Sequence, residues 1–186
     1  MAVFAHVTVS VDGYMAGPDI SAQEPMGRGG ARLHEWIFAD NEVDKSRVQD
    51  TFAAVGAVVL GRRTFDVGLD EWGDTPYPAP SFVLTHRAEP DREMKSASFH
   101  FVTDGIGNAL TRARAAAGDK DVVLMGGETI QQALRDGLVD RLNLQIAPVL
   151  LGDGLRMFDE TGHYELKPLA VTVSPTVTHM QYEIVR

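Results

Sequence analysis

Basic side chains follow two short apolar runs of the sequence, at 57–61 and 81–85, although the chain carries a net charge of −9. Guanidinium groups stay charged and match the geometry of phosphate oxygens. The sequence therefore predicts an anion-binding site built from residues at the ends of these runs: Arg62, Arg63, Thr64, Thr85, His86 and Arg87. The alternative is that the arginines are solvated or pair with the acidic residues Asp66, Asp70 or Glu71.

A glycine pair follows a third apolar run, at 121–125, and a helical pattern comes after it. A glycine pair lets a ligand approach the backbone, and a helix N-terminus offers free N–H groups with a partial positive charge. The residues of this turn are Gly126, Gly127, Glu128 and Thr129, and a tight turn without a ligand is the alternative. Three such strand ends suit an extended anion with separated phosphates. A dinucleotide with an additional 2′-phosphate has this form, so the pattern favours NADPH over NADH.

The three apolar runs belong to an alternation of strands and helices that would bring their ends together. Strands are expected at 2–11, 57–61, 81–85, 98–102 and 121–125, and helical spacing occurs at 33–37, 43–55, 104–117 and 130–138. The last third is β-rich, at 139–152, 164–175 and 177–186. The pattern predicts an α/β fold in three layers, with a mixed, mostly parallel central sheet and antiparallel C-terminal strands. No linker divides residues 1–186, so a single domain is expected, with ligands at the carboxyl ends of the parallel strands.

Composition narrows the classes of function. The acidic balance argues against a nucleic-acid partner, which needs a basic face. The absence of cysteine excludes disulfides and Cys-based zinc sites and fits a cytoplasmic protein, and the six histidines show no metal-ligand spacing. The N-terminus is interpreted as a first strand, and no apolar run approaches the ~20 residues of a membrane span.

Three further residues are candidates for the reacting end of the site. Asp12 follows the first strand and is the first candidate for a catalytic acid, although it also suits a turn with Gly13. Glu35 faces either a pocket or solvent. Trp36 either stacks on a flat substrate or packs in the core with its helical neighbours.

Taken together, these segments resemble the dihydrofolate reductase-like superfamily. The closer resemblance is to the C-terminal reductase domain of the bifunctional riboflavin-biosynthesis deaminase-reductase and its single-domain relatives. The matching stretches are VTVSVDGYMAG, VVLGRRTFD, FVLTHR, VVLMGGETIQQALRDGLVDRLNLQIAPVLLGDGLRMF and SPTVTHMQYEIV, which together extend over nearly the whole chain.

The resemblance implies a mixed sheet flanked by helices, NADPH as the hydride donor and a homodimer. It assigns the adenosine-side phosphates to Gly61, Arg62, Arg63 and Thr64, and the 2′-phosphate and adenine to Leu84, Thr85, His86 and Arg87. The resemblance also assigns contacts with the pyrophosphate to Met125, Gly126, Gly127, Glu128 and Thr129. Contacts with the nicotinamide are assigned to Val9, Ser10 and the 12–17 turn with Gly17.

Departures from the riboflavin enzymes weaken the case for their phosphorylated substrate. Tyr14 stands where those enzymes tend to have lysine, Met125 where an acidic residue is frequent, and Gly56 where aspartate is frequent. We therefore expect an NADPH-dependent reductase of a small pyrimidine or pterin, with 5-amino-6-(5-phosphoribosylamino)uracil-like compounds in that class. Tyr14, Glu35 and Trp36 would bind this substrate, and the loop at 21–30 would close over it. The alternative is a non-catalytic nucleotide-binding homodimer that acts as a sensor or scaffold.

Overall fold

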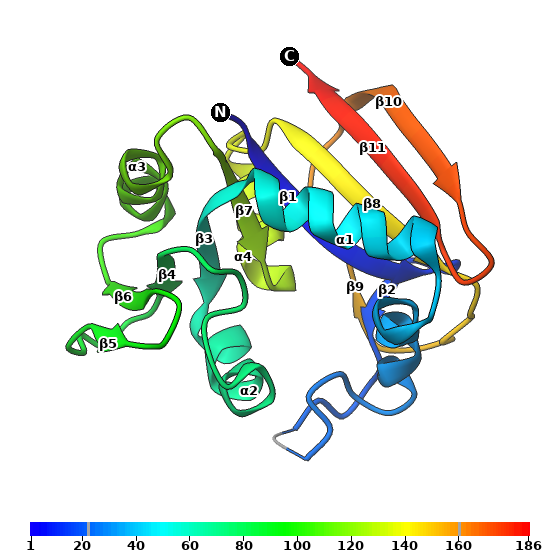
Figure 1. Ribbon diagram of the computed structural model, residues 1–186, viewed down its shortest axis with the longest axis horizontal. Helices are drawn as coiled ribbons and strands as arrows, with labels where there is room; N and C mark the ends of the chain where they lie inside the picture. The colour runs from blue at the N-terminus through cyan, green and yellow to red at the C-terminus, as the bar shows by residue number, and fades with distance from the viewer. Residues whose placement is uncertain (22, 160) are drawn as a thin grey trace.

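The computed structural model of the protein describes residues 1–21, 23–159 and 161–186, and a nine-stranded sheet forms its centre (Figure 1). The strands of this sheet are β1 (Val3–Ser10), β3 (Val55–Gly61), β4 (Ser81–Leu84), β5 (Arg92–Glu93), β6 (Ser98–Val102), β7 (Asp121–Met125), β8 (Arg141–Ala147), β10 (Glu165–Val173) and β11 (Thr178–Val185). Their order across the sheet is β10-β11-β8-β1-β7-β3-β4-β6-β5.

The six strands from β8 to β6 in that order run parallel to one another. β11 pairs antiparallel with β8, β10 pairs antiparallel with β11, and β5 pairs antiparallel with β6. The predicted mixed sheet with antiparallel C-terminal strands is therefore confirmed. A second sheet of two short strands, β2 (Tyr14–Ala16) and β9 (Leu155–Arg156), was not expected from the sequence.

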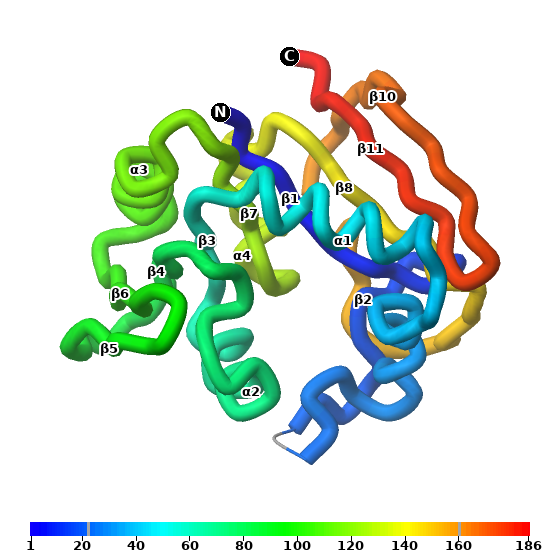
Figure 2. Tube along the Cα trace, in the orientation of Figure 1, coloured from blue at the N-terminus to red at the C-terminus, as the bar shows by residue number. Residues whose placement is uncertain are grey.

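Helices cover both faces of the sheet, which gives the predicted three layers (Figures 1 and 2). α3 (Ile106–Ala117) and α4 (Gly127–Arg135) share one core with the apolar side chains Val3, Ala5, Val7 and Val9 of β1. α1 (Glu42–Ala54) and α2 (Arg62–Trp72) lie on the other face, where a smaller core holds Phe4, Val58, Leu60 and Phe65.

The segment expected to be helical at 33–37 is a 3₁₀ helix, η1 (Gly30–Phe38). A 3₁₀ helix has about three residues per turn, so residues three apart share a face. Leu33 and Trp36 are accordingly buried, whereas Ile37 is 40% exposed and does not join them. The loop prediction at 21–30 includes residue 22, which lies outside the described residues. Within the described part, Met26 accepts a backbone hydrogen bond from Gly17, and Arg28 donates one to Pro18.

α3 begins two residues later than the helical spacing at 104–117 predicts. The N-cap is Gly105, which supplies no side-chain acceptor. Asp104 Oδ2 instead accepts a hydrogen bond of 2.8 Å from Nη2 of Arg112, two turns along the helix.

Candidate functional site

Two helices begin side by side at the carboxyl edge of the sheet. β3 and β7 are neighbouring parallel strands that place Leu60 opposite Met125, and α2 and α4 follow these strands directly. Their N-caps, Gly61 and Gly126, carry no side chain that accepts from the first turn. The free N–H groups of two helix N-termini therefore point toward one region, which is a geometry that suits a pyrophosphate.

Glycine is required at this edge because neighbouring atoms occupy the space of a side chain. Gly126 has φ 88°, and a Cβ atom there would overlap Oγ1 of Thr64. A Cβ atom on Gly127 would lie 2.6 Å from Sδ of Met15, and one on Gly61 would lie 3.0 Å from Oγ1 of Thr129. The turn at the start of α4 is thus a close-packed cradle that only glycine can form.

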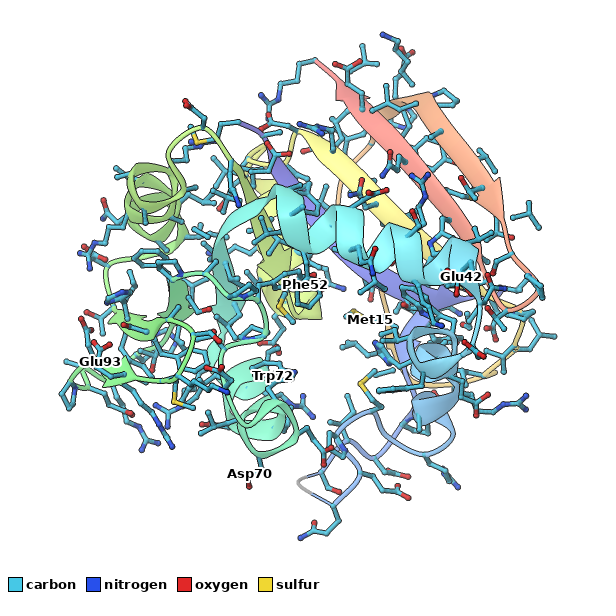
Figure 3. All side chains as sticks on the ribbon, viewed as in Figure 1. Met15, Glu42, Phe52, Asp70, Trp72 and Glu93 are labelled. Atoms are coloured by element: carbon cyan, nitrogen blue, oxygen red, sulfur yellow. The ribbon has the colours of Figure 1, made fainter. Side chains whose placement is uncertain are left out.

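Met15 is a contributor to this cradle that the sequence analysis did not single out as a site residue. Figure 3 shows Met15 and Trp72 on opposite sides of the carboxyl edge, from β2 and α2 respectively. The only sequence signal was the position of Met15 inside the turn at 12–17.

Arg62 is engaged by acidic side chains. Its Nε donates to Asp66 Oδ1 at 2.8 Å, as the alternative interpretation of the arginines held, and its Nη1 pairs with Glu89. The guanidinium also lies against the rings of Phe65 and Phe101, 5.6 and 5.9 Å from their centroids. Pairing with Glu89 had no sequence signal, because the two residues are 27 positions apart.

The other predicted basic residues are exposed beside Arg62. Arg63, His86 and Arg87 are all on the surface, and Arg63 and Arg87 form no ion pair within the described part of the chain. Leu84 pairs with Gly61 across β3 and β4, and Oγ1 of Thr85 accepts from the backbone N–H of Arg87 at 3.2 Å. The structure therefore brings these residues to one end of the edge.

A groove of about 660 Å³ lies beside α2 and β5, and Arg62 lines it, whereas Arg63, His86 and Arg87 do not. More acidic than basic side chains line this groove. The basic side chains are Arg62 and Arg92, and the acidic ones are Asp66, Asp70, Glu89, Asp91 and Glu93. A phosphate at this end must therefore compete with carboxylates for the guanidinium of Arg62.

Asp12 holds a loop in place. Its two carboxylate oxygens accept from the backbone N–H groups of Leu151, at 3.1 Å, and Gly152, at 2.7 Å. The hydroxyl of Ser10 and these two N–H groups lower the pKa of Asp12 to about 2. A carboxylate with this pKa carries no proton near neutral pH, so the geometry supports a structural role for Asp12 and argues against the predicted role as an acid.

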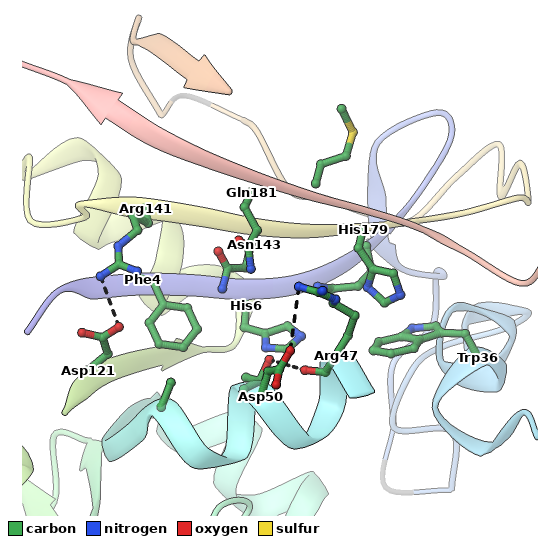
Figure 4. Close-up of a pocket in the computed structure, with 14 residues that line it drawn as sticks. Phe4, His6, Trp36, Arg47, Asp50, Asp121, Arg141, Asn143, His179 and Gln181 are labelled. Carbon is green, nitrogen blue, oxygen red and sulfur yellow. Dashed lines mark hydrogen bonds and ion pairs between the residues drawn. The ribbon is translucent and has the colours of Figure 1, made fainter. Parts of the chain in front are cut away.

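The three predicted substrate residues differ in their surroundings. Tyr14 accepts a hydrogen bond of 2.8 Å from Arg156, whose guanidinium also lies 4.5 Å from the centre of the tyrosine ring. Glu35 is exposed, whereas Trp36 is buried and its Nε1 donates to Oγ1 of Thr8 at 3.1 Å. Trp36 also lines a cavity beneath α1 (Figure 4).

The remaining predicted cofactor residues flank the edge. Val9 and Ser10 are buried at the end of β1, and Oγ of Ser10 accepts from the N–H of Tyr14 at 2.9 Å. A Cβ atom on Gly17 would overlap the carbonyl oxygen of Arg28, so Gly17 permits close packing of the neighbouring loop. Glu128 is exposed in the first turn of α4.

Neither a metal cluster nor a membrane span is found in the described residues. Across 1–21, 23–159 and 161–186, no three or more His, Asp or Glu side chains are grouped so that they could hold a metal ion. In the same ranges, every helix is too short or too polar to cross a bilayer.

Comparison with known proteins agrees with this geometry. A model of the family described as the RibD C-terminal domain matches residues 1–180. A candidate riboflavin biosynthesis protein from Shewanella sp. PV-4 is 26% identical, with a TM-score of 0.78 and 100% of both chains covered. The protein YwjB of Bacillus subtilis (strain 168) is 22% identical over 156 residues, which are 83% of this chain and 81% of YwjB. A dihydrofolate reductase from Enterococcus faecalis, solved with NADP(H), shares the fold at 13% identity and a TM-score of 0.62, with 98% of this chain and 96% of that chain covered.

Proposed function

The chain belongs to the RibD C-terminal domain family, and we therefore propose that it is an NADPH-dependent reductase of a small nitrogen heterocycle of the pyrimidine or pterin type. The family is reductase-like, which supports an oxidoreductase. The observation that carries the proposal is the pair of uncapped helix N-termini, α2 and α4, at adjacent parallel strand ends.

The residues present fit NADPH at this edge. No side chain caps the first N–H groups of α4 at the turn of Gly126 and Gly127, so these groups would bind the pyrophosphate, with Thr129 beside them. The exposed Arg63 and Arg87 supply cations for further phosphate oxygens. The nicotinamide end would lie toward Val9, Ser10 and Met15. When bound there, NADPH supplies the hydride, and the protein supplies position and electrostatics.

The proton that accompanies hydride transfer needs another source than Asp12. The pKa of Asp12 is about 2, and its carboxylate is occupied by the N–H groups of Leu151 and Gly152. We therefore propose that solvent water protonates the reduced heterocycle, while Asp12 fixes the loop that follows β8.

The same observation favours the second candidate, a non-catalytic nucleotide-binding homodimer. A site that binds NADPH, and whose candidate acid Asp12 is ionised near neutral pH, suits a sensor or scaffold. This alternative shares the cofactor site with the reductase and differs only in turnover.

We also propose that the protein is a cytoplasmic homodimer that pairs through β10 and β11. The apolar side chains Leu169, Val171 and Val173 of β10 are 48%, 56% and 72% exposed. The sheet register places Val171 beside Met180 of β11. An exposed apolar sheet face of this kind is characteristic of an interface.

The proposal is tested by following the absorbance of reduced nicotinamide while the protein is incubated with NADPH and a panel of pyrimidines and pterins. Loss of absorbance with one heterocycle, in step with its reduction and absent in Gly126→Ala, is the expected result. NADPH binding without oxidation by any compound of the panel would favour the non-catalytic alternative.

A further inference from the structure

The thioether of Met15 lies on the first turn of α4, whose free N–H groups form the proposed pyrophosphate site. A Cβ atom on Gly127 would lie 2.6 Å from Sδ of Met15 and 3.3 Å from its Cε. Gly127 is the first residue of α4, so the sulfur lies directly against the backbone where the helix begins. Figure 3 shows Met15 at this carboxyl edge of the sheet, on the side opposite Trp72.

Strand β2 gives Met15 this position. Side chains alternate between the two faces of a strand, and Tyr14 and Ala16 are buried on one face of β2. Met15 points to the other face, where it is half-buried. The strand β9 pairs with β2, and Cδ2 of its Leu155 would lie 3.1 Å from the same Cβ atom on Gly127. The thioether of Met15 is therefore held at the start of α4 and is partly open to solvent.

The start of α4 lacks a side-chain acceptor. Gly126 is the N-cap residue and has no side chain that could accept from the first N–H groups of the helix. A thioether sulfur is only a weak hydrogen-bond acceptor, so Met15 leaves these groups free although it lies beside them. The helix N-terminus also carries a partial positive charge, which favours an oxygen acceptor with partial negative charge. One oxygen atom added to the sulfur of Met15 would supply such an acceptor.

Peroxides add this oxygen to methionine side chains that they can reach. A lone pair of the sulfur attacks one oxygen of hydrogen peroxide, and the O–O bond breaks. The proton of the transferred hydroxyl passes to the leaving hydroxide, so the sulfur is oxidised to a sulfoxide and the peroxide is reduced to water. Methionine sulfoxide reductases reverse the step. The half-buried Met15 is partly exposed to such an oxidant, whereas Met157 is fully buried.

The sulfoxide oxygen of Met15 and the pyrophosphate of a dinucleotide would compete for the same N–H groups. The oxygen would be bonded to an atom that already lies against Gly127, so the free N–H groups of the first turn of α4 are within its reach. An acceptor tethered to the protein has a high effective concentration, so it holds these groups against a free ligand. The added oxygen would also take up space over the turn at Gly126 and Gly127.

We propose that Met15 is an oxidation site, and that its sulfoxide caps α4 and thereby closes the cofactor site. Oxidation by peroxide then stops the protein from binding NADPH, and reduction of the sulfoxide restores binding. The loss of NADPH binding rests on the proposed function, whereas the capping of α4 does not.

The experiment treats the protein with hydrogen peroxide, removes the peroxide and then makes three measurements. Peptide mass spectrometry gives the oxidised fraction of each methionine, calorimetry gives the affinity for NADPH, and urea titration gives the midpoint of unfolding. Met15→Leu keeps an apolar side chain of similar volume that peroxide does not oxidise, and Met15→Gln supplies a carbonyl oxygen without oxidation. The matched control is Met94→Leu, which removes another half-buried methionine, from the segment between β5 and β6.

We expect peroxide to oxidise Met15 and to weaken NADPH binding about tenfold or more in the wild type and in Met94→Leu, as the loss of hydrogen bonds to a charged group predicts. Met15→Leu should have the same affinity before and after the treatment, and untreated Met15→Gln should bind NADPH more weakly than untreated Met15→Leu. Oxidation should lower the urea midpoint of the wild type less than that of Met15→Leu, because only the wild type gains the cap. Methionine sulfoxide reductases should restore NADPH binding to the oxidised wild type.

The proposal is overturned if Met15 stays unoxidised while Met94 is oxidised, if the oxidised wild type binds NADPH as tightly as the untreated protein, or if Met15→Leu loses affinity on treatment as the wild type does. Failure of the proposed function gives a different result. An untreated wild type that does not bind NADPH removes the cofactor site, and the urea midpoints then decide the capping of α4. A wild type that loses at least as much stability on oxidation as Met15→Leu contradicts the cap.

Discussion

Glu89 competes with the cofactor for Arg62, and this competition should weaken cofactor binding by a measurable amount. Arg62 pairs with both Asp66 and Glu89, while Arg63 beside it carries no carboxylate partner in the described residues. An adenosine-side phosphate of the cofactor that binds Arg62 must displace Glu89. Substitution of Glu89 by glutamine should therefore strengthen the binding of NADPH and of NADH, because both cofactors carry this phosphate.

The magnitude follows from the exposure of the pair. The side chains of Arg62 and Glu89 are each 34% exposed, so solvent screens part of their attraction. Exposed ion pairs contribute about 0.2–1 kcal/mol, and hydrogen bonds to charged groups about 1.5–3 kcal/mol. The interaction free energy of a partly exposed pair such as Arg62–Glu89 lies between these ranges, at about 1 kcal/mol. Removal of this competition corresponds to about fivefold tighter binding of NADPH.

The assay is isothermal titration calorimetry with NADPH and NADH, and the matched control is Asp70→Asn. Asp70 lines the same groove and is not among the partners of Arg62, so Asp70→Asn makes the same change in net charge without freeing the guanidinium. Equal gains in the two variants would show a general charge effect, and unchanged NADPH affinity in Glu89→Gln would show that Arg62 does not bind the phosphate.

Three further predictions follow from particular contacts. Gly126→Ala should lower the free energy of unfolding by about 1–3 kcal/mol in urea titrations, because Gly126 has a positive φ and a Cβ atom there would overlap Thr64. The control Gly137→Ala should lower it less, because Gly137 also has a positive φ but no atom lies where its Cβ would be placed. Burial lowers the pKa of His6 from 6.5 to about 4, so between pH 4 and 6.5 the folded state binds fewer protons than the unfolded state. The free energy of unfolding should therefore fall by up to about 3 kcal/mol as the pH drops from 6.5 to 4. The variant His6→Leu should show a weaker dependence on pH. In sedimentation velocity the wild type should sediment as the proposed dimer and Val171→Asp as a monomer; a Val171→Asp variant that remains dimeric would exclude β10 from the interface, and a monomeric wild type would exclude the dimer.

The fold was accessible from sequence because its signals are local. Apolar runs such as 57–61 are buried on both faces of the sheet, and the turn at Gly126 and Gly127 ends a strand where the pattern placed it. The two-stranded β2–β9 sheet was missed because its pairing joins Tyr14 to Arg156, and no local pattern reports such a distant contact.

The site was less accessible because its electrostatics depend on distant partners. The state of Asp12 is set by N–H groups about 140 positions later in the chain, and Arg62 is engaged by Glu89. The polar side chains His6, Asn143 and Gln181, which lie side by side on the sheet, did leave a local signal, because polar and apolar residues alternate in β1, β8 and β11. Only the sheet register shows that the polar residues of these three strands share one face.

The central claim, that the carboxyl edge of the sheet is an NADPH site, is tested most directly by calorimetric titration of NADPH and NADH. The proteins are the wild type, the double variant Arg62→Ala with Arg63→Ala, and a control with Arg112→Ala and Arg114→Ala on α3, which removes the same charge elsewhere. The account predicts tighter binding of NADPH than of NADH, a loss of at least about 1.5 kcal/mol for NADPH in the first double variant, and no comparable loss in the control. Absence of binding by either cofactor to the wild type would contradict the account.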